Sequence, residues 1–276
     1  MTRVLITGGA KGLGQACVRT ALTDGCHVTV LDADANGLTQ LPAGVSAIYA
    51  DLADAAELRS AINRLSASEP FDIVIMNAGI NATGPFETLP VERQAKLIAV
   101  NLTAPMALTT ALIQADKIAR DGRLVFVSSL SHFVSYPGAS TYAGTKDGLT
   151  IFARSLRRPL RRSLGIRVQV VAPGPMDTDH ATEHSPSPDD RRARVAPAFV
   201  ADAIWRNRSG FLIVPGMAAN GVSILGRLLP GVAGRIMRRM IFEKLQVRTP
   251  VQDTHSAREQ SSLHALHPDQ FLTEEP

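Results

Sequence analysis

Short apolar runs of strand length alternate along the chain with longer segments in which apolar residues recur with the period of a helix. The runs predict strands at residues 4–7, 28–32, 47–50, 73–77, 123–128, 167–172 and 211–214. The longer segments predict helices at residues 13–23, 55–66, 92–118, 141–164 and 197–206. Nearly continuous apolar strands separated by helices are typical of a parallel sheet covered on both faces. We therefore expect an α/β fold with a doubly wound parallel sheet of about seven strands.

The regular alternation stops near residue 215, which predicts three parts. Residues 1–215 are expected to form one α/β domain, and residues 216–247 an amphipathic helical extension, because apolar residues and arginines recur there at helical spacing. Residues 248–276 are polar and are expected to be a disordered tail. The polar segment 180–194 follows a strand and contains two prolines, so we expect it to form a mobile lid.

Composition is that of a globular protein, with 45% apolar and 20% charged residues. The chain begins almost at once with a strand, which leaves no room for a secretory signal, and we find no uncharged apolar run of ~18 residues that would span a membrane. Cys17 and Cys26 lack metal-ligand spacing and are expected to be reduced packing residues. These features predict a cytoplasmic protein without a metal site.

The net charge is +4, and arginines are concentrated in segment 141–164 and beyond residue 216. Such clusters could contact nucleic acid, but no aromatic residues are interleaved with them and no nucleic-acid-binding motif is present. We interpret them as solvent-exposed faces and expect no nucleic-acid partner.

A glycine-rich turn follows the first strand and opens the first helix. Glycines permit a tight turn and let the backbone approach a pyrophosphate, which rests at the helix N-terminus where N–H groups are unpaired. The strand–turn–helix context is the one that a dinucleotide site requires. The predicted cofactor contacts in the turn are Gly8, Lys11, Gly12, Leu13 and Gly14.

Two charged residues bear on which dinucleotide binds. Asp32 ends the second strand, where a carboxylate can accept hydrogen bonds from ribose hydroxyls and repel a 2′-phosphate, which favours NAD. Lys11 favours NADP, because a cation in the turn could meet that phosphate. Since Asp32 acts directly on the phosphate whereas Lys11 can turn into solvent, we predict NAD and keep NADP as the alternative.

Further cofactor contacts are expected where the third and fourth strands end. Asp51 could accept a hydrogen bond from the adenine amino group, and Leu52 would pack beside the ring. The small residues Asn77, Ala78 and Gly79 would let a cofactor ribose lie close to the backbone.

Tyr142 and Lys146 lie four residues apart in a predicted helix, which places both side chains on one face. A neighbouring ammonium favours the phenolate and is expected to lower the tyrosine pKa from its ordinary value of ~10. Such a phenol can exchange a proton with a substrate oxygen, while the Ser129 hydroxyl at the end of the adjacent strand holds that oxygen.

Together these residues resemble the single-domain form of the short-chain dehydrogenase/reductase family over about residues 3–214. The resemblance implies a Rossmann-like fold, a nicotinamide cofactor, reversible carbonyl/alcohol chemistry and a homodimer or homotetramer. It rests on the glycine turn, Asp51, Asn77-Ala78-Gly79, Asn101, Ser129, Tyr142, Lys146 and Pro173-Gly174.

The resemblance also implies roles for individual residues. Tyr142 is then the general acid/base, and Lys146 lowers its pKa and holds the nicotinamide ribose. Ser129 polarises the substrate oxygen, with Ser128 as the neighbouring candidate, since strand alternation lets only one face the site. Asn101 matches the asparagine that orders a water between the lysine and solvent.

The segment after the sixth strand matches the one that receives the nicotinamide carboxamide, through Pro173, Gly174 and Thr178. Substrate contacts are expected from Ser129, His132, Tyr136 and Met176, although a surface or capping role explains His132 equally well.

The leading interpretation is therefore that residues 1–215 bind a dinucleotide and interconvert a secondary alcohol and a ketone with NAD(H). The alternatives are an NADPH-dependent carbonyl reductase and a non-catalytic dinucleotide-sensing scaffold, against which the intact Ser129, Tyr142 and Lys146 argue.

The extension is expected to pack on the body or on another subunit, with peripheral membrane contact as the alternative. It could also shield an apolar substrate such as a lipid, terpenoid or steroid alcohol. Its apolar residues at helical spacing are Leu225, Leu228, Leu229, Ile236, Met237, Met240 and Ile241.

Overall fold

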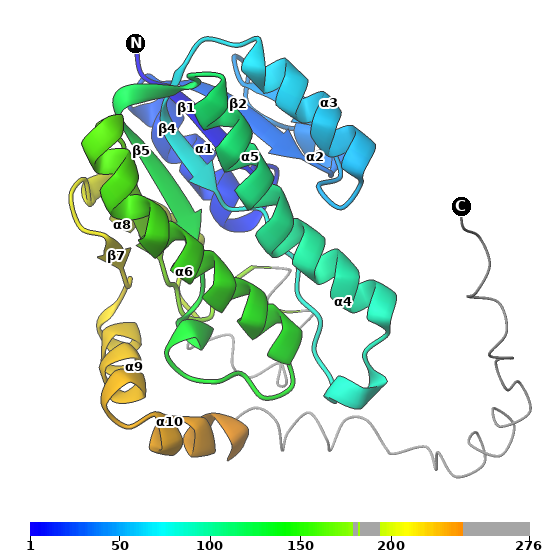
Figure 1. The fold of residues 1–276 in the computed structure, drawn as a ribbon, viewed down its shortest axis with the longest axis vertical. Coiled ribbons are helices and arrows are strands. Elements are labelled where there is room, and N and C mark those ends of the chain that lie inside the picture. Colours follow the sequence, from blue (N-terminus) through cyan, green and yellow to red (C-terminus); the bar gives the residue numbers. More distant parts are fainter. Residues whose placement is uncertain (179–181, 183–193, 240–276) are drawn as a thin grey trace, which may run out of the picture.

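The computed structural model describes residues 1–178, 182 and 194–239. In this part of the chain the strands are β1 (Arg3–Thr7), β2 (His27–Asp32), β3 (Ser46–Tyr49), β4 (Phe71–Met76), β5 (Ile118–Val127), β6 (Arg167–Val171) and β7 (Leu212–Ile213). They form one parallel sheet in the order β3-β2-β1-β4-β5-β6-β7 (Figure 1). The predicted doubly wound α/β fold is therefore confirmed.

The strand order reverses at β1, which pairs with β2 on one side and with β4 on the other. In open α/β sheets, ligands bind at the carboxyl ends of the strands beside such a reversal. The segments that follow β1, β4 and β5 therefore meet where a ligand is expected.

Helices cover both faces of the sheet (Figure 1). The helices α3 (Ala55–Ser66), α5 (Ala104–Gln114) and α6 (Ser140–Ser163) bury their apolar sides against one face. The helices α1 (Gly12–Thr23) and α8 (Pro197–Arg206) pack against each other and cover the opposite face.

The short helix α2 (Ala35–Thr39) is not predicted by the apolar pattern. It begins after Asp34, whose side chain accepts a hydrogen bond from the Gly37 backbone N–H at 3.0 Å. A helix this short depends on its cap rather than on a periodic apolar face.

A continuous helix runs from Val91 to Gln114 through α4 (Val91–Ile98), a π-helical turn (Ala99–Thr103) and α5. It is long and apolar enough to cross a membrane by length and composition, so the prediction that no such segment exists is wrong. Leu97, Leu108 and Leu112 are fully buried on the sheet. The segment is therefore packed as a core helix of the α/β domain.

The predicted helix over residues 92–118 ends earlier than expected, at Gln114. Asp116 adopts a left-handed conformation with φ of 54°, and the Lys117 N–H donates to the Leu112 carbonyl at 2.7 Å. This geometry ends the helix. Ile118 then begins β5 opposite Phe71.

The predicted helical extension is present as α9 (Met217–Leu228) and α10 (Pro230–Met237). Val222, Leu225 and Ala233 from these helices pack on Phe133 and Val134, which follow β5. Except for Thr182 and Arg194, the predicted lid lies outside the described residues, and so do Met240, Ile241 and the predicted tail.

Arg123 of β5 is buried and holds the end of α8 against the sheet. Its side chain donates to Gln169 Oε1 at 2.8 Å and to the backbone carbonyls of Ile204 at 2.6 Å and Asn207 at 3.0 Å. Burial lowers the pKa of Arg123 to about 10.

We predict that Arg123→Met lowers the free energy of unfolding by about 2–4 kcal/mol, because it removes the side-chain donor to the Ile204 carbonyl and to the buried Gln169 Oε1. Urea denaturation followed by circular dichroism measures the loss. Arg120→Met is the matched control, since Arg120 is exposed on the same strand and its replacement should change stability by less than about 0.5 kcal/mol. Equal losses in the two variants would contradict this role for Arg123.

Candidate active site

The glycine turn between β1 and α1 is closely packed against the end of β4. Gly8 has φ of +68°, and a Cβ atom there would lie 2.8 Å from the Cα of Ala78. A Cβ on Gly14 would lie 1.9 Å from the Gly8 carbonyl oxygen, so neither position accepts a side chain. The side chain of the N-cap residue Lys11 does not cap the first turn of α1, and a helix N-terminus of this kind suits a pyrophosphate.

Asn77, a predicted cofactor contact, braces this turn. Its side-chain amide donates to the carbonyls of Thr7 at 3.0 Å and Gly8 at 2.9 Å. The Thr7 hydroxyl in turn accepts from the backbone N–H groups of Asn77 and Ala78, both at 3.0 Å. The sequence pattern did not single out Thr7 as a residue that holds the site together.

The carboxylate of Asp32 is tied to the same turn. One oxygen accepts from the Ala10 N–H at 2.9 Å, and the other accepts from the Asp34 N–H at 2.9 Å. Lys11 forms an ion pair with Asp34 at 2.7 Å, and hydrogen bonding to Lys11 lowers the pKa of Asp34. Asp32, which favours NAD, and Lys11, which favours NADP, therefore both lie beside a third charged residue, Asp34.

Asp51 follows β3 and is also held by protein groups. It accepts from the Ala53 N–H at 2.9 Å and pairs with Lys96 at 3.0 Å. Burial alone would raise the pKa of Asp51, but these two partners lower it. Leu52 is buried, with 7% of its surface exposed.

Tyr142 and Lys146 lie one turn apart on α6, and the Lys146 ammonium is 5.8 Å from the centre of the Tyr142 ring. The ammonium donates to the Val127 carbonyl at the end of β5, at 2.9 Å. The Ser129 hydroxyl is hydrogen-bonded to the Tyr142 phenol and therefore faces the site. Three of the four predicted catalytic residues are thus brought together.

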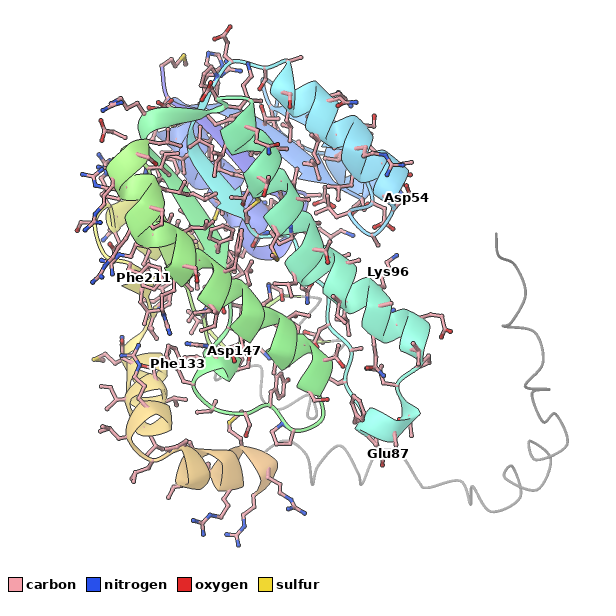
Figure 2. The ribbon with its side chains drawn as sticks, viewed as in Figure 1. Asp54, Glu87, Lys96, Phe133, Asp147 and Phe211 are labelled. Carbon is pink, nitrogen blue, oxygen red and sulfur yellow. The ribbon has the colours of Figure 1, made fainter. Side chains whose placement is uncertain are left out.

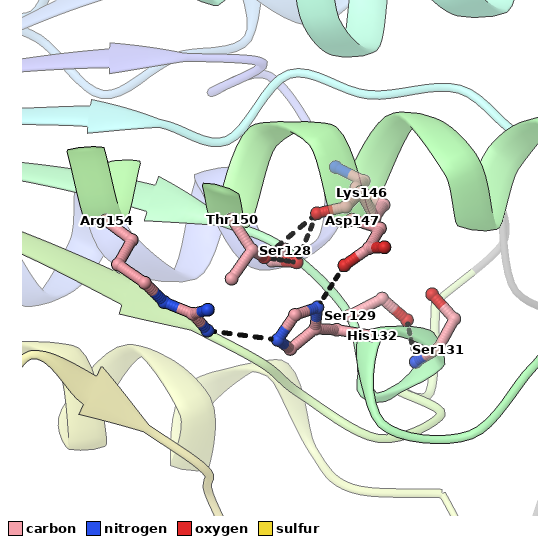
Figure 3. A network of polar contacts seen from close by, with 8 residues as sticks. All are labelled: Ser128, Ser129, Ser131, His132, Lys146, Asp147, Thr150 and Arg154. Atoms are coloured by element: carbon pink, nitrogen blue, oxygen red, sulfur yellow. Dashed lines mark hydrogen bonds and ion pairs between the residues drawn. The ribbon is translucent and has the colours of Figure 1, made fainter. Parts of the chain in front are cut away.

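Ser128 has a different role from Ser129. Its hydroxyl lies 2.9 Å from the Lys146 carbonyl and 2.7 Å from the Thr150 hydroxyl, both on α6 (Figure 3). Ser128 therefore fixes α6 on β5, which leaves Ser129 as the serine beside Tyr142.

The fourth predicted residue, Asn101, lies in the π-helical turn and is fully buried. Its amide donates to the Ile80 carbonyl at 2.9 Å and to the Thr145 hydroxyl at 3.2 Å, and its oxygen accepts from the Ile80 N–H at 2.8 Å. A Cβ on Gly79 would lie 3.1 Å from the Lys146 ammonium and 3.4 Å from the Asn101 oxygen. Asn101 and Lys146 are thus neighbours across Gly79, and π-helical turns often mark functional sites.

The pKa of Tyr142 departs from the prediction. Burial raises it to about 12, and the hydrogen bond from Ser129, rather than the charge of Lys146, is what lowers it in part. Burial also lowers the pKa of Lys146 to about 8. The expected direction for Tyr142 was wrong for this structure because desolvation of the phenolate outweighs the hydrogen bond from Ser129.

The segment after β6 closes over the glycine turn. A Cβ on Gly12 would lie 3.2 Å from the Thr178 methyl group. The Pro173 carbonyl accepts from the Leu130 N–H at 3.1 Å, and Gly174 lies against the Leu130 side chain. The predicted carboxamide-binding segment therefore lies between the glycine turn and the end of β5.

The predicted substrate contacts divide into two groups. The Tyr136 ring lies edge-on to the Tyr142 ring, with centroids 6.3 Å apart. The His132 ring instead contacts the Asp147 carboxylate through Nδ1, and its Nε2 lies 3.5 Å from Arg154 (Figure 3). These contacts tie the His132 side chain to Asp147 and Arg154 of α6.

Met176 pairs with Val195 through a short parallel bridge, and its side chain packs in the core beneath α1 and α8. Among the described residues, no group of three or more His, Cys, Asp or Glu side chains is placed to hold a metal ion.

We predict that the buried Lys146 makes the stability of the protein rise with pH. Its pKa is about 8 in the folded chain and about 10.5 when unfolded, so between these values the unfolded chain binds more protons and the free energy of unfolding increases, by about 3 kcal/mol. Lys146→Met should abolish most of this rise when urea denaturation is repeated from pH 7 to pH 10. The Lys96→Met variant, which removes a half-exposed lysine, should retain it. A wild-type stability that falls over this window would refute the assignment.

Comparison with known proteins identifies relatives over most of the chain. A family model described as short chain dehydrogenase matches residues 2–189. The 3-oxoacyl-[acyl-carrier-protein] reductase FabG of Escherichia coli (strain K12) is 31% identical over 196 residues, which cover 69% of this chain and 79% of FabG. The cyclic-di-GMP-binding biofilm dispersal mediator protein of the same organism is 31% identical over 187 residues, covering 67% of this chain and 78% of that protein.

A solved structure shares the fold. The short-chain dehydrogenase from Sphingobium yanoikuyae in complex with NADPH aligns with a TM-score of 0.68 and 25% identity, and the alignment covers 82% of this chain and 93% of that one.

Proposed function

The chain belongs to the short-chain dehydrogenase family and is an oxidoreductase, and we propose that it interconverts a secondary alcohol and a ketone by hydride transfer with NAD(H). The observation that supports this most is the convergence of Ser129, Tyr142 and Lys146 at the end of β5, beside Gly79 and the glycine turn. A bound nicotinamide dinucleotide would supply or accept the hydride.

The residues of the chain then handle the proton and the substrate oxygen. As negative charge develops on the carbonyl oxygen, the Tyr142 phenol donates its proton to it. Ser129, already hydrogen-bonded to that phenol, holds the same oxygen and stabilises the charge where it grows. The hydrogen bond from Ser129 also favours the phenolate that remains, next to the Lys146 ammonium.

The raised pKa of Tyr142 favours the reducing direction. With a pKa of about 12, the phenol carries its proton at neutral pH and is ready to donate it. Alcohol oxidation instead needs the phenolate as base. The relative FabG is named a reductase, which agrees with a ketone substrate.

We propose that the substrate is apolar, such as a lipid, terpenoid or steroid ketone. Tyr136 presents its ring edge-on beside Tyr142. The same segment buries Phe133 and Val134 against α9 and α10, so an apolar layer lies behind the segment that carries Tyr136.

We predict that Tyr142→Phe lowers kcat for ketone reduction by about 10²–10⁴-fold, because the proton donor is lost while the ring remains. The assay is a panel of ketones from small and polar to steroid-sized, followed at the nicotinamide absorbance with both dinucleotides. Tyr49→Phe, an exposed tyrosine on β3, is the control and should keep the wild-type rate.

Two outcomes of this panel would count against the proposal. An unchanged rate in Tyr142→Phe would remove the acid/base role. A higher kcat/KM for small polar ketones than for large apolar ones would remove the proposed substrate class while leaving the reaction type intact.

The charges around Lys11 support NAD(H) over NADP(H). Asp32 and Asp34 contribute two carboxylates at the end of β2, against one ammonium that is already paired with Asp34. The surplus of negative charge would repel a 2′-phosphate. The NADPH bound to the Sphingobium protein is what favours the alternative.

We predict that NADH binds at least about tenfold more tightly than NADPH in fluorescence titrations. Asp34→Asn removes the carboxylate that pairs with Lys11, and Asp32→Asn removes a second repelling charge, so the double variant should narrow or reverse the preference for NADH over NADPH. Asp121→Asn, which removes one carboxylate from an exposed position of β5, should leave the ratio of the two affinities unchanged. Tighter NADPH binding by the wild type would establish the alternative cofactor.

A further inference from the structure

The helices α9 and α10 expose an apolar stripe on the side opposite to the one they bury. In α9, the buried residues are Ala219, Ser223 and Gly226. Met217, Ile224 and Leu228 are separated by seven and four residues, so they share a helix face, and their exposed fractions are 93%, 55% and 73%. The stripe continues through the exposed residues Leu229, Val232 and Ile236.

The charge of this surface has one sign. Residues 217–239 contain four arginines and no aspartate or glutamate. Arg227 lies over the Phe133 ring at 4.8 Å, whereas Arg235, Arg238 and Arg239 are exposed on or just beyond α10. In Figure 2, nitrogen-tipped side chains project from α10 away from the rest of the fold.

We propose that the exposed face of α9 and α10 binds the surface of an anionic lipid bilayer. Leucine and isoleucine side chains beside arginines suit the boundary between acyl chains and anionic head groups. A second copy of this chain fits less well, because pairing the same face would bring two sets of arginines together without carboxylates to neutralise them.

Binding of α9 and α10 to a bilayer would also affect the proposed active site, because these helices lie close to it. The helix α9 packs on Phe133 and Val134, and Tyr136 in the same segment lies beside Tyr142. Bilayer binding would hold this segment close to the membrane surface, from which an apolar ketone could enter. That consequence rests on the proposed function, whereas bilayer binding itself does not.

The test is sedimentation of the full chain with vesicles of phosphatidylcholine alone or mixed with phosphatidylglycerol. We expect binding to the anionic vesicles only, weakened by raised salt. Leu228→Glu and the double variant Arg235→Glu/Arg238→Glu should each weaken binding by at least about tenfold. Ketone reduction measured without vesicles reports separately on the proposed function.

Matched controls test whether the loss of vesicle binding is specific to substitutions on this face. Val91→Glu introduces the same charge at a valine of α4 that is 72% exposed, close to the 73% of Leu228. Arg59→Glu/Arg64→Glu makes the same change in net charge on the exposed side of α3. Both controls should bind anionic vesicles like the wild type.

Three results would overturn the proposal. The first is no binding to anionic vesicles, and the second is equal weakening by the controls. The third is a change from dimer to monomer on ultracentrifugation of Leu228→Glu with vesicle binding unaltered, which would make a second copy the occupant. Circular dichroism of each variant checks that it folds, and the salt dependence of the wild type tests the proposal without any substitution.

Discussion

The ammonium group of Lys146 is buried where the end of β5 meets α6, and the rest of the site is arranged around it. It donates to the Val127 carbonyl, and no ion pair joins it to a carboxylate in the described part of the chain. Burial consequently lowers its pKa to about 8. A buried ammonium without a carboxylate partner lowers the free energy of unfolding at neutral pH. The presence of a lysine at this position is best explained by the Tyr142 phenol one turn away on the same helix.

The groups around this ammonium are fixed by backbone contacts as much as by side chains. Gly79 leaves the space that the ammonium fills, since a Cβ there would come within 3.1 Å of it. Ser128 bonds to the Lys146 carbonyl and holds this turn of α6 on the sheet. The glycine turn is fixed in a similar way, because the side chains of Asn77 and Asp32 form hydrogen bonds with its backbone. Residues predicted as cofactor contacts thus also pre-organise the place where a dinucleotide would lie.

Much of this could be predicted because the signals are local in the sequence. The strand positions, the glycine turn and the four-residue spacing of Tyr142 and Lys146 each depend on a few neighbouring residues. The end of the long helix could not be predicted, since the apolar pattern continues to Ile118 and only the backbone conformation of Asp116 interrupts it. The pairing of His132 with Asp147 also had no local signal, because it depends on the turn after β5 folding back on α6.

The direction of the Tyr142 pKa was missed for a related reason. Spacing along a helix reveals which charge is near a phenol, but desolvation is set by every element that covers it, and here desolvation dominates. The choice between Ser128 and Ser129 was likewise left open, because alternation shows that two neighbouring residues face opposite sides without showing which side carries the site. The contacts of Ser128 with α6 decide it.

The break in the sequence pattern near residue 215 is a change of periodicity and does not separate two bodies in space. A Cβ on Gly226 of α9 would lie 2.2 Å from the Phe133 carbonyl oxygen, and one on Gly234 of α10 would lie 3.2 Å from the Ser135 hydroxyl. Such close approach requires glycine at the contact with α9. The backbone of α9 therefore packs on the backbone of the segment that places Tyr136 beside Tyr142, and α10 packs on a side chain of the same segment. The exposed face of α9 therefore lies on the other side of this helix from the segment that places the Tyr136 ring beside Tyr142.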